Sequence, residues 1–300
     1  MSENHEDDNP ADPKDGSRSI DELMMEVTSQ WREDPRSVDE LILAAMCEQD
    51  EDLAWDAVVV LHWRGSREIL DRALSLCGSA CAFERRVGAE ILGQLGVPER
   101  SFPEECLRTL LRMLEMEQDA VALRAILIAL SHHDEIEAID AALRFRNHVD
   151  DDLRHGVVVV LMGHNEPRAI EGLIELTRDS DVRVRDWATF GLGSQTDADT
   201  PELRAALLDR LSDEDGTTRE EAMVGLAARK DPRVLPILRD ELVHEDGVGT
   251  LAVEAAGLIA EPSLLPLLLP LREWWDVEPE TLEDAIQACS PKSDASDNQD

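Results

Sequence analysis

The chain of 300 residues has no tyrosine, and aromatic residues of all kinds make up 3% of it. Lysine is nearly missing too: Lys14, Lys230 and Lys292 are the three lysines, so almost all of the 29 basic residues are arginines. Hydrophobic residues nevertheless reach 43%. A core with so few aromatic rings must consist of Leu, Val, Ile and Ala.

The sequence also lacks membrane and secretion signals. No apolar run is long enough to cross a membrane, and the first residues lack a basic and apolar leader. The cysteine number is odd and no two cysteines have CxxC spacing, which favours reduced, buried thiols in a cytoplasmic protein. Cys77 and Cys81 flank a predicted turn and are the one pair that we consider for a disulfide. The five cysteines are Cys47, Cys77, Cys81, Cys106 and Cys289.

Motifs of the common enzyme classes are missing as well. The chain contains no HExxH zinc motif, no nucleophile elbow, no P-loop and no glycine-rich dinucleotide loop. Paired catalytic carboxylates cannot be singled out among 66 acidic residues. We therefore predict a protein that is not an enzyme and has no catalytic residues, no cofactor and no metal site.

Negative charge is what the chain has in excess. The formal net charge is −37, of which residues 1–19 carry −4 and residues 290–300 carry −2, so about −31 lies between them. Such a surface repels phosphate backbones and attracts basic proteins or peptides, which excludes nucleic acid as the expected partner. Two interpretations of the acidity stay open: adaptation to concentrated salt, and the ordinary acidity of many helical proteins.

Short apolar and polar stretches alternate along the chain in a way that predicts pairs of helices. Residues 1–18 are an acidic tail without apolar residues to bury, and we expect them to be disordered, as we do residues 290–300. Ser19 and Glu22 form a capping box, which predicts an N-terminal capping helix that ends near Trp31. The predicted pairs are about 37–47 with 52–63, 67–77 with 82–95, 104–115 with 120–131, 136–146 with 151–162, 168–178 with 182–193, 201–211 with 217–228, 233–243 with 248–258, and 263–275 with 279–289.

The second helix of each pair repeats one motif, seen best in the segment 181–193. Val184, Ala188 and Leu192 recur every four residues and form one apolar stripe. An arginine follows the first apolar residue in most copies. Prolines recur between the pairs and predict the first turn of the next helix. The arginines are Arg85, Arg124, Arg154, Arg185 and Arg219, and the prolines are Pro98, Pro167, Pro201, Pro232 and Pro262. Pro236 and Pro266 lie inside predicted first helices and predict a kink there.

This pattern resembles HEAT repeats, and in particular the phycobilisome-lyase HEAT-like repeats, over about residues 36–275. The resemblance implies an all-α, right-handed α-solenoid of about eight helix pairs within residues 19–289, with the second helices on the concave face. It also implies that an aspartate at the turn within each pair is bound by the next arginine, a structural ladder rather than an anion track. The matching acids are Asp119, Asp150 or Asp151, Asp181 and Asp215, while Ala54 and Gly249 replace the arginine at the two ends.

The family likeness extends to deoxyhypusine hydroxylase, whose iron ligands are His-Glu pairs at the start of second helices. Here the matching place reads Arg154-His155-Gly156, and the other copies have no histidine, so the ligand set is absent. Four further histidines fall near the ends of second helices. They either cap helix ends as cations or converge on a metal, and we favour the cap. They are His62, His132, His133 and His164.

Extra apolar residues surround the stripe in two second helices. Val158, Val159 and Val160 do so in one, and Ile126, Ile128 and Ala129 in the helix before it. Two interpretations remain: burial between neighbouring pairs, or a concave apolar strip that binds a partner. The strip would contain Trp55, Ala125, His155, Val159, Trp187 and Phe190, with Asp56, Glu90, Asp186 and Glu220 around it.

Trp187 has a second interpretation, which is packing against the helix of Arg154. At the other end of the chain, Trp274 and Trp275 are adjacent and cannot both face the core. The one that points away is either exposed or covered by the helix 279–289, and we favour the cover. The sequence as a whole predicts a protein-binding scaffold or adaptor that holds a basic protein or peptide on its concave face. The alternative from the resemblance is a lyase-type or accessory enzyme subunit.

Overall fold

The computed structural model describes residue 29 and residues 31–244 and 247–291, and this part contains sixteen α-helices and no strand. The helices pack in eight sequential pairs, as the sequence predicts. The predicted acidic tail 1–18, most of the predicted capping helix and almost all of the segment 290–300 lie outside the described residues.

Each pair consists of a first helix and a second helix. The first helices are α2 (Val38–Cys47), α4 (Arg67–Cys77), α6 (Pro103–Met116), α8 (Ile136–Ala142), α10 (Pro167–Leu176), α12 (Pro201–Arg210), α14 (Leu235–Glu241) and α16 (Leu265–Leu268). The second helices are α3 (Glu51–Arg64), α5 (Ala82–Gly93), α7 (Ala120–Leu130), α9 (Asp151–Leu161), α11 (Val182–Ser194), α13 (Gly216–Ala228), α15 (Thr250–Ile259) and α17 (Pro279–Cys289). Short 3-10 turns extend three of the first helices: η1 (Leu143–Phe145), η2 (Pro232–Val234), η3 (Pro262–Leu264) and η4 (Leu269–Glu273).

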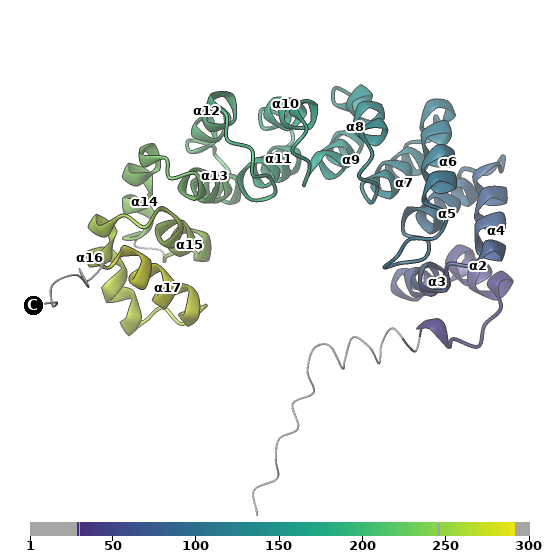
Figure 1. Cartoon of the computed structure of the whole chain (residues 1–300), viewed down its shortest axis with the longest axis horizontal. Helices are drawn as coiled ribbons and strands as arrows, with labels where there is room; N and C mark the ends of the chain where they lie inside the picture. Colours follow the sequence, from purple (N-terminus) through teal and green to yellow (C-terminus); the bar gives the residue numbers. More distant parts are fainter. Residues whose placement is uncertain (1–28, 30, 245–246, 292–300) are drawn as a thin grey trace, which may run out of the picture.

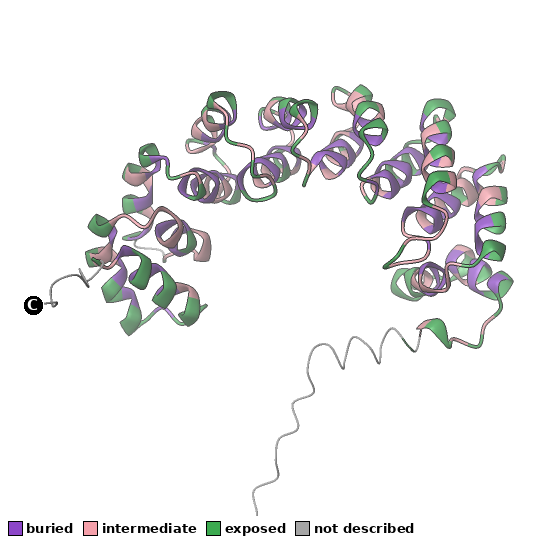
Figure 2. Ribbon diagram, viewed as in Figure 1, coloured by how far each residue is buried: buried purple, intermediate pink, exposed green. Residues whose placement is uncertain are grey.

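The pairs follow one another along an open arc, with α8, α10 and α12 on its outer side and α7, α9, α11 and α13 on its inner side (Figure 1). Every second helix from α5 to α17 packs against the second helix of the pair before it as well as against its own partner. The buried residues lie between the two rows and between neighbouring pairs (Figure 2). One aliphatic core therefore runs through the array, as expected from a sequence with so few aromatic residues.

Aspartates begin most of the second helices. The side chains of Asp50, Asp119, Asp150, Asp181 and Asp215 each accept a hydrogen bond from a backbone N–H of the first turn. These bonds satisfy donors that have no partner inside the helix, and a carboxylate there also suits the positive end of the helix dipole. The aspartates expected to bind the arginine ladder are thus occupied as helix caps.

Two of the five predicted proline starts are first residues of α-helices. Pro167 begins α10 and Pro201 begins α12, while Pro232 and Pro262 begin the 3-10 turns η2 and η3. The prediction for Pro98 is wrong, because α6 begins at Pro103 and Pro98 lies in the preceding turn.

The kinks predicted at Pro236 and Pro266 are replaced by a change of helix type. A 3-10 turn comes first in each case, and the α-helix begins one residue before the proline. Each proline therefore lies in a first helical turn, where the missing N–H breaks no hydrogen bond.

The inner helices α11 and α13 approach each other closely through glycines. A Cβ atom added to Gly225 would lie 2.6 Å from the Cα atom of Gly193. This distance leaves no room for a side chain, so both positions need glycine for the two backbones to meet. Gly225 is the tenth residue after the N-cap Asp215 of α13, and Gly193 is the twelfth after the N-cap Asp181 of α11. Their contact fixes how the two helices are aligned along their axes.

The extra apolar residues are mostly buried between neighbouring pairs. Val158, Val160 and Ile126 are fully buried and Ala129 is nearly so, whereas Val159 is partly exposed. Ile128 is also partly exposed. The burial interpretation therefore holds for all of these residues except Ile128 of α7 and Val159 of α9, which occupy equivalent positions in their helices.

Trp275 is buried and donates from its indole Nε1 to the carbonyl of Val248, at 2.8 Å. Trp274 is 55% exposed. The expected cover for the outward tryptophan is therefore wrong, because Trp275 takes the buried position and Trp274 lies in solvent.

The cysteines are free thiols, so the pairing considered for Cys77 and Cys81 does not form. Cys77, Cys106 and Cys289 are buried as predicted, but Cys47 and Cys81 are exposed. None of the described helices is both long and apolar enough to cross a membrane.

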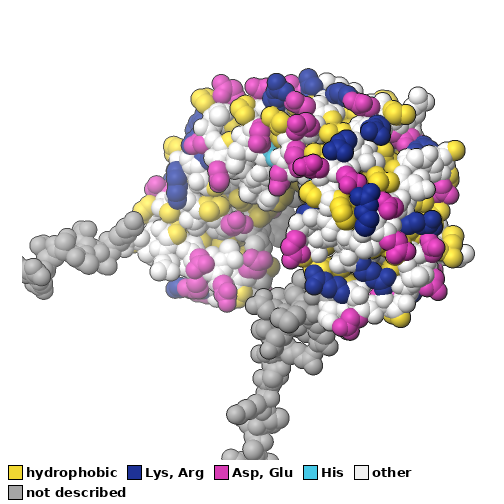
Figure 3. All heavy atoms as spheres, turned by 45° about the vertical axis from the view of Figure 1, so that its right-hand side comes forward, with side chains coloured by type: hydrophobic (Ala, Val, Ile, Leu, Met, Phe, Trp, Pro, Cys, Tyr) yellow, Lys and Arg dark blue, Asp and Glu magenta, His cyan; other side chains and the backbone are white. Residues whose placement is uncertain are grey.

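Ion pairs join successive first helices along the outer side of the arc. Asp39 binds Arg72 between α2 and α4, and Arg67 binds Glu105 between α4 and α6. Further pairs are Asp140 with Arg168 and Arg178 with Asp209. Basic and acidic side chains accordingly lie among one another on the side of the molecule in Figure 3. Each exposed pair contributes at most about 1 kcal/mol, so the buried core decides stability.

Candidate functional site on the inner helices

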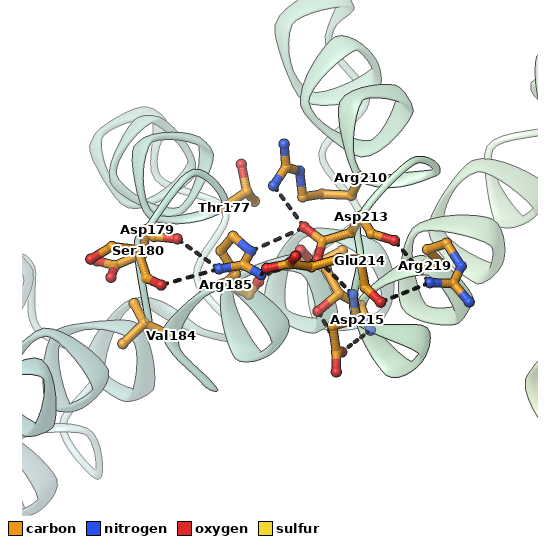
Figure 4. Close-up of polar contacts among 12 residues, drawn as sticks. Thr177, Asp179, Ser180, Val184, Arg185, Arg210, Asp213, Glu214, Asp215 and Arg219 are labelled. Carbon is orange, nitrogen blue, oxygen red and sulfur yellow. Dashed lines mark hydrogen bonds and ion pairs between the residues drawn. The ribbon is translucent and has the colours of Figure 1, made fainter. Parts of the chain in front are cut away.

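Three arginines of the predicted ladder are bound between consecutive pairs. Arg85, Arg154 and Arg185 each donate from Nε and from a terminal nitrogen to a single carboxylate, with Nε distances of 2.6, 2.7 and 3.0 Å. Their remaining nitrogen donates to two backbone carbonyls of the turn before their own helix. Figure 4 shows this arrangement around Arg185. The carboxylates are Glu117, Asp179 and Asp213.

The bound carboxylate is not the one that the resemblance implied. It lies two residues before the capping aspartate of the next pair: Asp179 precedes Asp181, and Asp213 precedes Asp215. The arginine therefore connects its own turn to the following one. Each such pair is nearly buried, and the bidentate geometry holds neighbouring pairs in a fixed orientation.

Arg124 does not occupy the ladder position. The ladder arginines are the fourth residue after the N-cap of their helix. In α7 the fourth residue after the N-cap is Leu123, and Arg124 is the fifth. Leu123 is buried at that place, and Arg124 is exposed and makes no hydrogen bond or ion pair within the described residues. Arg219 does take the fourth position, where it donates to the carbonyls of Asp213 and Glu214.

Bound arginines leave no continuous positive surface for an anion. In each of the three complete ladder pairs the guanidinium is shared between a carboxylate and backbone carbonyls, as in Figure 4. The ladder is therefore a structural feature that fixes the curvature of the array, and a binding surface has to come from other positions.

Two positions of the second helices are at least partly exposed in most repeats: the fifth and the ninth residue after the cap, with Val224 of α13 as a buried exception. The fifth residues from α3 to α15 are Trp55, Arg86, Arg124, His155, Asp186, Glu220 and Glu254. The ninth residues are Val59, Glu90, Ile128, Val159, Phe190, Val224 and Leu258. The ninth positions thus form a mainly apolar stripe, and the fifth positions change from basic to acidic along the array.

His155, Trp187 and Phe190 form one aromatic cluster across α9 and α11. The ring centroids of His155 and Trp187 are 5.5 Å apart, and those of Trp187 and Phe190 are 6.0 Å apart, both in edge-on geometry. Trp187 remains 40% exposed. Packing against the helix of Arg154 and exposure on the inner surface, the two interpretations of Trp187, therefore apply together.

The other predicted contact residues are distributed differently. Val159 lies at the ninth position of α9, which corresponds to Phe190 in α11, and it is partly exposed. Ala125 is 8% exposed and offers little surface. Trp55 is 45% exposed, but it lies on α3 and packs on His62 of the same helix. The aromatic cluster thus contains the predicted residues of α9 and α11 and excludes Trp55.

His155 has two ring nitrogens that are buried without a hydrogen-bond partner. Its pKa is lowered, first by burial and then by the positive charges of Arg183 and Arg124. The ring is consequently neutral at neutral pH, with one nitrogen able to donate and the other able to accept.

Four carboxylates gather next to the aromatic cluster, on α11, α13 and α15. Glu221 lies near enough to Asp186, Glu220 and Glu254 for all three charges to raise its pKa. Burial is the larger cause, and together these effects bring the pKa of Glu221 to about 7. The pKa values of Asp186 and Glu220 are raised as well, mainly by burial. Within the described residues none of the four forms an ion pair, and Oδ1 of Asp186 is buried without a partner.

Sequence reasoning named Asp186 and Glu220 only as surrounding acids and missed Glu221 and Glu254. The four residues are spread over three repeats, and only the stacking of α11, α13 and α15 brings them together. A signal was present in the sequence, because Asp186, Glu220 and Glu254 share the fifth position after the cap.

Two of the four histidines near the ends of second helices, His62 and His133, do not act as cationic caps. His62 is buried against the carbonyl of Glu90, at 2.9 Å from Nε2, and burial lowers its pKa to about 4. Burial also lowers the pKa of His133 to about 4, and Arg100 lies 3.2 Å from its Nε2. Both rings are therefore neutral. Within the described part of the chain, no three His, Cys, Asp or Glu side chains are placed to hold a metal ion.

Comparison with known proteins identifies the same kind of repeat. Residues 170–257 match the family described as HEAT repeats, which covers α10 to α15. The segment 170–257 is a run of HEAT repeats. The chain is similar to Protein YibA of Escherichia coli K12, with 27% identity over 228 residues, which span 70% of this chain and 76% of that protein.

Solved structures show the same HEAT-repeat fold. The crystal structure of the Escherichia coli YibA protein superposes with a TM-score of 0.70 at 24% identity, over 88% of this chain and 96% of the other. A crystal structure of importin beta has a TM-score of 0.54 at 13% identity, over 84% of this chain and 42% of importin beta. The likeness to HEAT repeats in general is thereby established, whereas nothing in these comparisons singles out the phycobilisome-lyase group.

Proposed function

We propose that this HEAT-repeat protein is a non-enzymatic adaptor whose inner helices hold a basic segment of a partner protein. The observation that carries the proposal is the group of unpaired carboxylates on α11, α13 and α15 beside the exposed ring of Trp187. Elsewhere in the array some acidic side chains bind arginines, as Asp213 does, or cap helices, as Asp181 does. These four have neither role, and a cationic ligand would supply the missing partner.

The aromatic and acidic residues are complementary to lysine and arginine side chains. An aromatic face attracts a cation and packs on its hydrocarbon stem, and carboxylates bind the charged end. Phe190 and Val159 add apolar contact area at the ninth position, which gives the partner a fixed register that charge alone would not provide.

The inner surface also gives the partner a direction. Arg124 is exposed and unpaired on α7, and the acidic cluster begins two second helices later, at Asp186 of α11. A basic segment is repelled at the first of these places and attracted at the second. We infer that an extended partner lies with its basic end over α11 to α15, and with neutral or acidic residues toward α7.

A titration with a short peptide of alternating lysine and leucine tests this function. Calorimetry of the full chain should detect binding that weakens as salt rises, because the attraction is electrostatic. A peptide with glutamate in place of lysine should not bind. Equal binding of both peptides would show that charge complementarity does not select the partner and would contradict the proposal.

Proton release gives a second and more local readout. The pKa of Glu221 is about 7, so about half of the molecules carry a proton there at neutral pH. A bound lysine lowers this pKa and releases that proton. Binding enthalpies measured at pH 7 in buffers of different ionisation enthalpy should differ accordingly, and the difference should vanish in Glu221→Gln. A buffer-independent enthalpy in the wild-type chain would place the peptide elsewhere.

Substitutions on the inner surface test the aromatic contacts. The double change Trp187→Ala with Val159→Asp removes the ring and interrupts the apolar stripe at two partly exposed positions, so the fold should remain. Peptide binding should weaken by about tenfold or more, since an aromatic anchor contributes about 2 kcal/mol. Trp55→Ala is the matched control, an exposed inner tryptophan on α3, and it should bind as the wild type does. A folded double variant with unchanged affinity would exclude the inner surface as the site.

A lyase-type or accessory enzyme subunit is the second candidate, motivated by the likeness of the second-helix motif to phycobilisome-lyase HEAT-like repeats. An accessory subunit needs a second polypeptide with which it forms a stable complex. Stoichiometric co-purification with a catalytic subunit would favour this role over that of an adaptor. For either role the five free thiols support a cytoplasmic location.

A further inference from the structure

A cavity of about 660 Å³ lies between the first helices α4 and α6, away from the inner carboxylates. Its apolar wall consists of Leu74 and Cys77 from α4, and of Met113 and Met116 from α6. Burial raises the pKa of the Cys77 thiol to about 12, so this side chain is a neutral part of the wall. The volume lies within the range of about 300–1,000 Å³ that is typical of small-molecule sites.

Two arginines without partners border this cavity. Arg108 and Arg112 lie one turn apart on α6, and within the described residues neither forms a hydrogen bond or an ion pair. The two acids that line the cavity are already bound, since Glu105 pairs with Arg67 and Glu117 with Arg85. Two unpaired guanidinium groups thus lie beside an apolar wall in this strongly acidic chain.

The corresponding groove between α10 and α12 shows what the repeat does elsewhere. It is lined by polar residues, and its arginines are paired: Arg178 with Asp209, and Arg185 and Arg210 with Asp213. Between α4 and α6, Met113 and Met116 take the place of such polar residues. The repeat geometry alone therefore does not produce an apolar cavity with free arginines.

The local charge agrees with this difference. Residues 64–112 contain eight arginines and seven acidic residues, in a chain whose net charge is −37. Figure 3 brings this side of the molecule forward and shows basic side chains next to hydrophobic ones. At physiological salt the charge of more distant repeats is screened over about 8 Å, so nearby groups decide which ions bind.

We propose that the cavity between α4 and α6 binds an aliphatic carboxylate, that is, a hydrocarbon chain with one carboxylate at its end. The hydrocarbon lies against Leu74, Met113 and Met116, whose flexible thioethers adapt to an irregular ligand. The carboxylate binds Arg108 and Arg112, whose planar guanidinium groups match it in two-point geometry. Apolar burial and charge pairing thus act on the two ends of one molecule.

Decanoate is the probe. Decanol, which has the hydrocarbon chain but no carboxylate, and acetate, which has the carboxylate but no long chain, are the two control ligands. The full chain should bind decanoate at least about tenfold more tightly than either, because a charge-assisted hydrogen bond contributes about 1.5–3 kcal/mol. Decanol that binds as tightly as decanoate would show that the arginines take no part. Acetate that binds as tightly would show that the apolar wall takes no part. Either result overturns the proposal.

The variant Arg108→Gln with Arg112→Gln tests the two arginines. Its preference for decanoate over decanol should disappear, while the melting temperature stays within error, because neither side chain has a partner to lose. Arg144→Gln is the matched control, an exposed arginine of the outer row that also has no partner in the described part of the chain. Loss of the preference in the control, or its persistence in the double variant, would contradict the proposal.

Methyl NMR of methionine reports where the probe binds. On addition of decanoate the resonances of Met113 and Met116 should shift, and those of Met162, which follows α9, and Met223, on α13, should not. Assignment by Met116→Leu is safe, since Met116 is 74% exposed. Shifts at other methionines alone would mean a different site. Binding of an acidic, leucine-rich peptide in place of decanoate would make the cavity a protein-docking surface and reject the small-molecule proposal.

Discussion

The inner surface of α11, α13 and α15 displays carboxylates without cationic partners, whereas the outer cavity between α4 and α6 displays arginines without acidic ones. Sequence composition shows the same contrast: residues 64–112 have eight basic and seven acidic residues, and residues 186–291 have eight basic and 23 acidic ones. Both surfaces belong to one array of the same repeat.

The contrast shows which parts of a repeat are free to vary. Buried apolar positions recur in both regions, because each pair must pack on the next in the same way. Positions five and nine of the second helices, and the outer faces of the first helices, have no such constraint. Binding chemistry can therefore differ from one repeat to another without any change of fold.

The largest expected effect tests the core that both surfaces share. Leu161 is fully buried, and Leu161→Ala should lower the free energy of unfolding by about 2–5 kcal/mol through the cavity that it leaves. Val159→Ala, a truncation of a partly exposed neighbour, should cost about 1 kcal/mol or less. Urea denaturation measures both. Similar losses for the two variants would show that the inner face of α9 is packed as tightly as its core face.

A smaller effect separates ladder arginines from inner-surface arginines. Arg185→Leu leaves Asp213 buried with Arg210 as its remaining partner, and the expected loss is about 3 kcal/mol. Arg124→Leu removes an exposed side chain without a partner and should change stability by about 0.5 kcal/mol or less. The same denaturation experiment decides between them. A large loss in the free energy of unfolding for Arg124→Leu would show that Arg124 has the structural role of a ladder arginine.

The acidic surface should make stability depend on pH. The pKa of Glu221 is about 7 in the folded chain, above its ordinary value of 4.5. Protonated Glu221 is therefore favoured by folding, so its contribution is most stabilising below pH 4.5 and is lost as the pH rises through 7. Glu221→Gln should be more stable than the wild type at pH 8 and show no difference at pH 4. Thermal unfolding across this range provides the measurement.

An acid of the other region provides the control for this titration. Glu115 is exposed on α6, and Glu115→Gln should leave the pH profile unchanged. An equal shift in both variants would mean that net charge, rather than the burial of Glu221 among other carboxylates, controls the profile.

Salt should produce the smallest effect. Molar KCl screens repulsion among the excess acids and should raise the melting temperature by about 2–4 °C, equivalent to about 1 kcal/mol. The variant Glu220→Gln with Glu254→Gln should show a smaller rise, because it removes charge from the crowded inner surface. Glu99→Gln with Glu115→Gln, near α4 and α6, should keep the full rise. A melting temperature that does not increase with KCl would contradict the salt-adapted interpretation of the composition.

Local sequence determined the helices and most of their ends. A capping aspartate and an apolar residue every three or four positions act within one turn, so Asp181 and the stripe from Val184 to Leu192 were sufficient to predict α11. The same holds for the pairing, because a helix with one apolar stripe must pack against its neighbours. The prolines were less reliable, since Pro98 lies in a turn instead of beginning α6, and Pro236 lies in the first turn of α14 instead of kinking a helix.

Tertiary structure decided the partners of these helices. Arg185 binds Asp213, 28 residues later, and only the stacking of one pair on the next selects that acid in preference to the nearer Asp181. The sequence alignment placed Arg124 at the ladder position for the same reason. The apolar residues around Arg124 fit two alignments that differ by one residue, and the sequence alone does not choose between them. The cluster of Asp186, Glu220, Glu221 and Glu254 and the cavity between α4 and α6 both arise from side chains of different repeats. Charge repulsion and close packing act through space, so their consequences depend on distances that the order of residues does not contain.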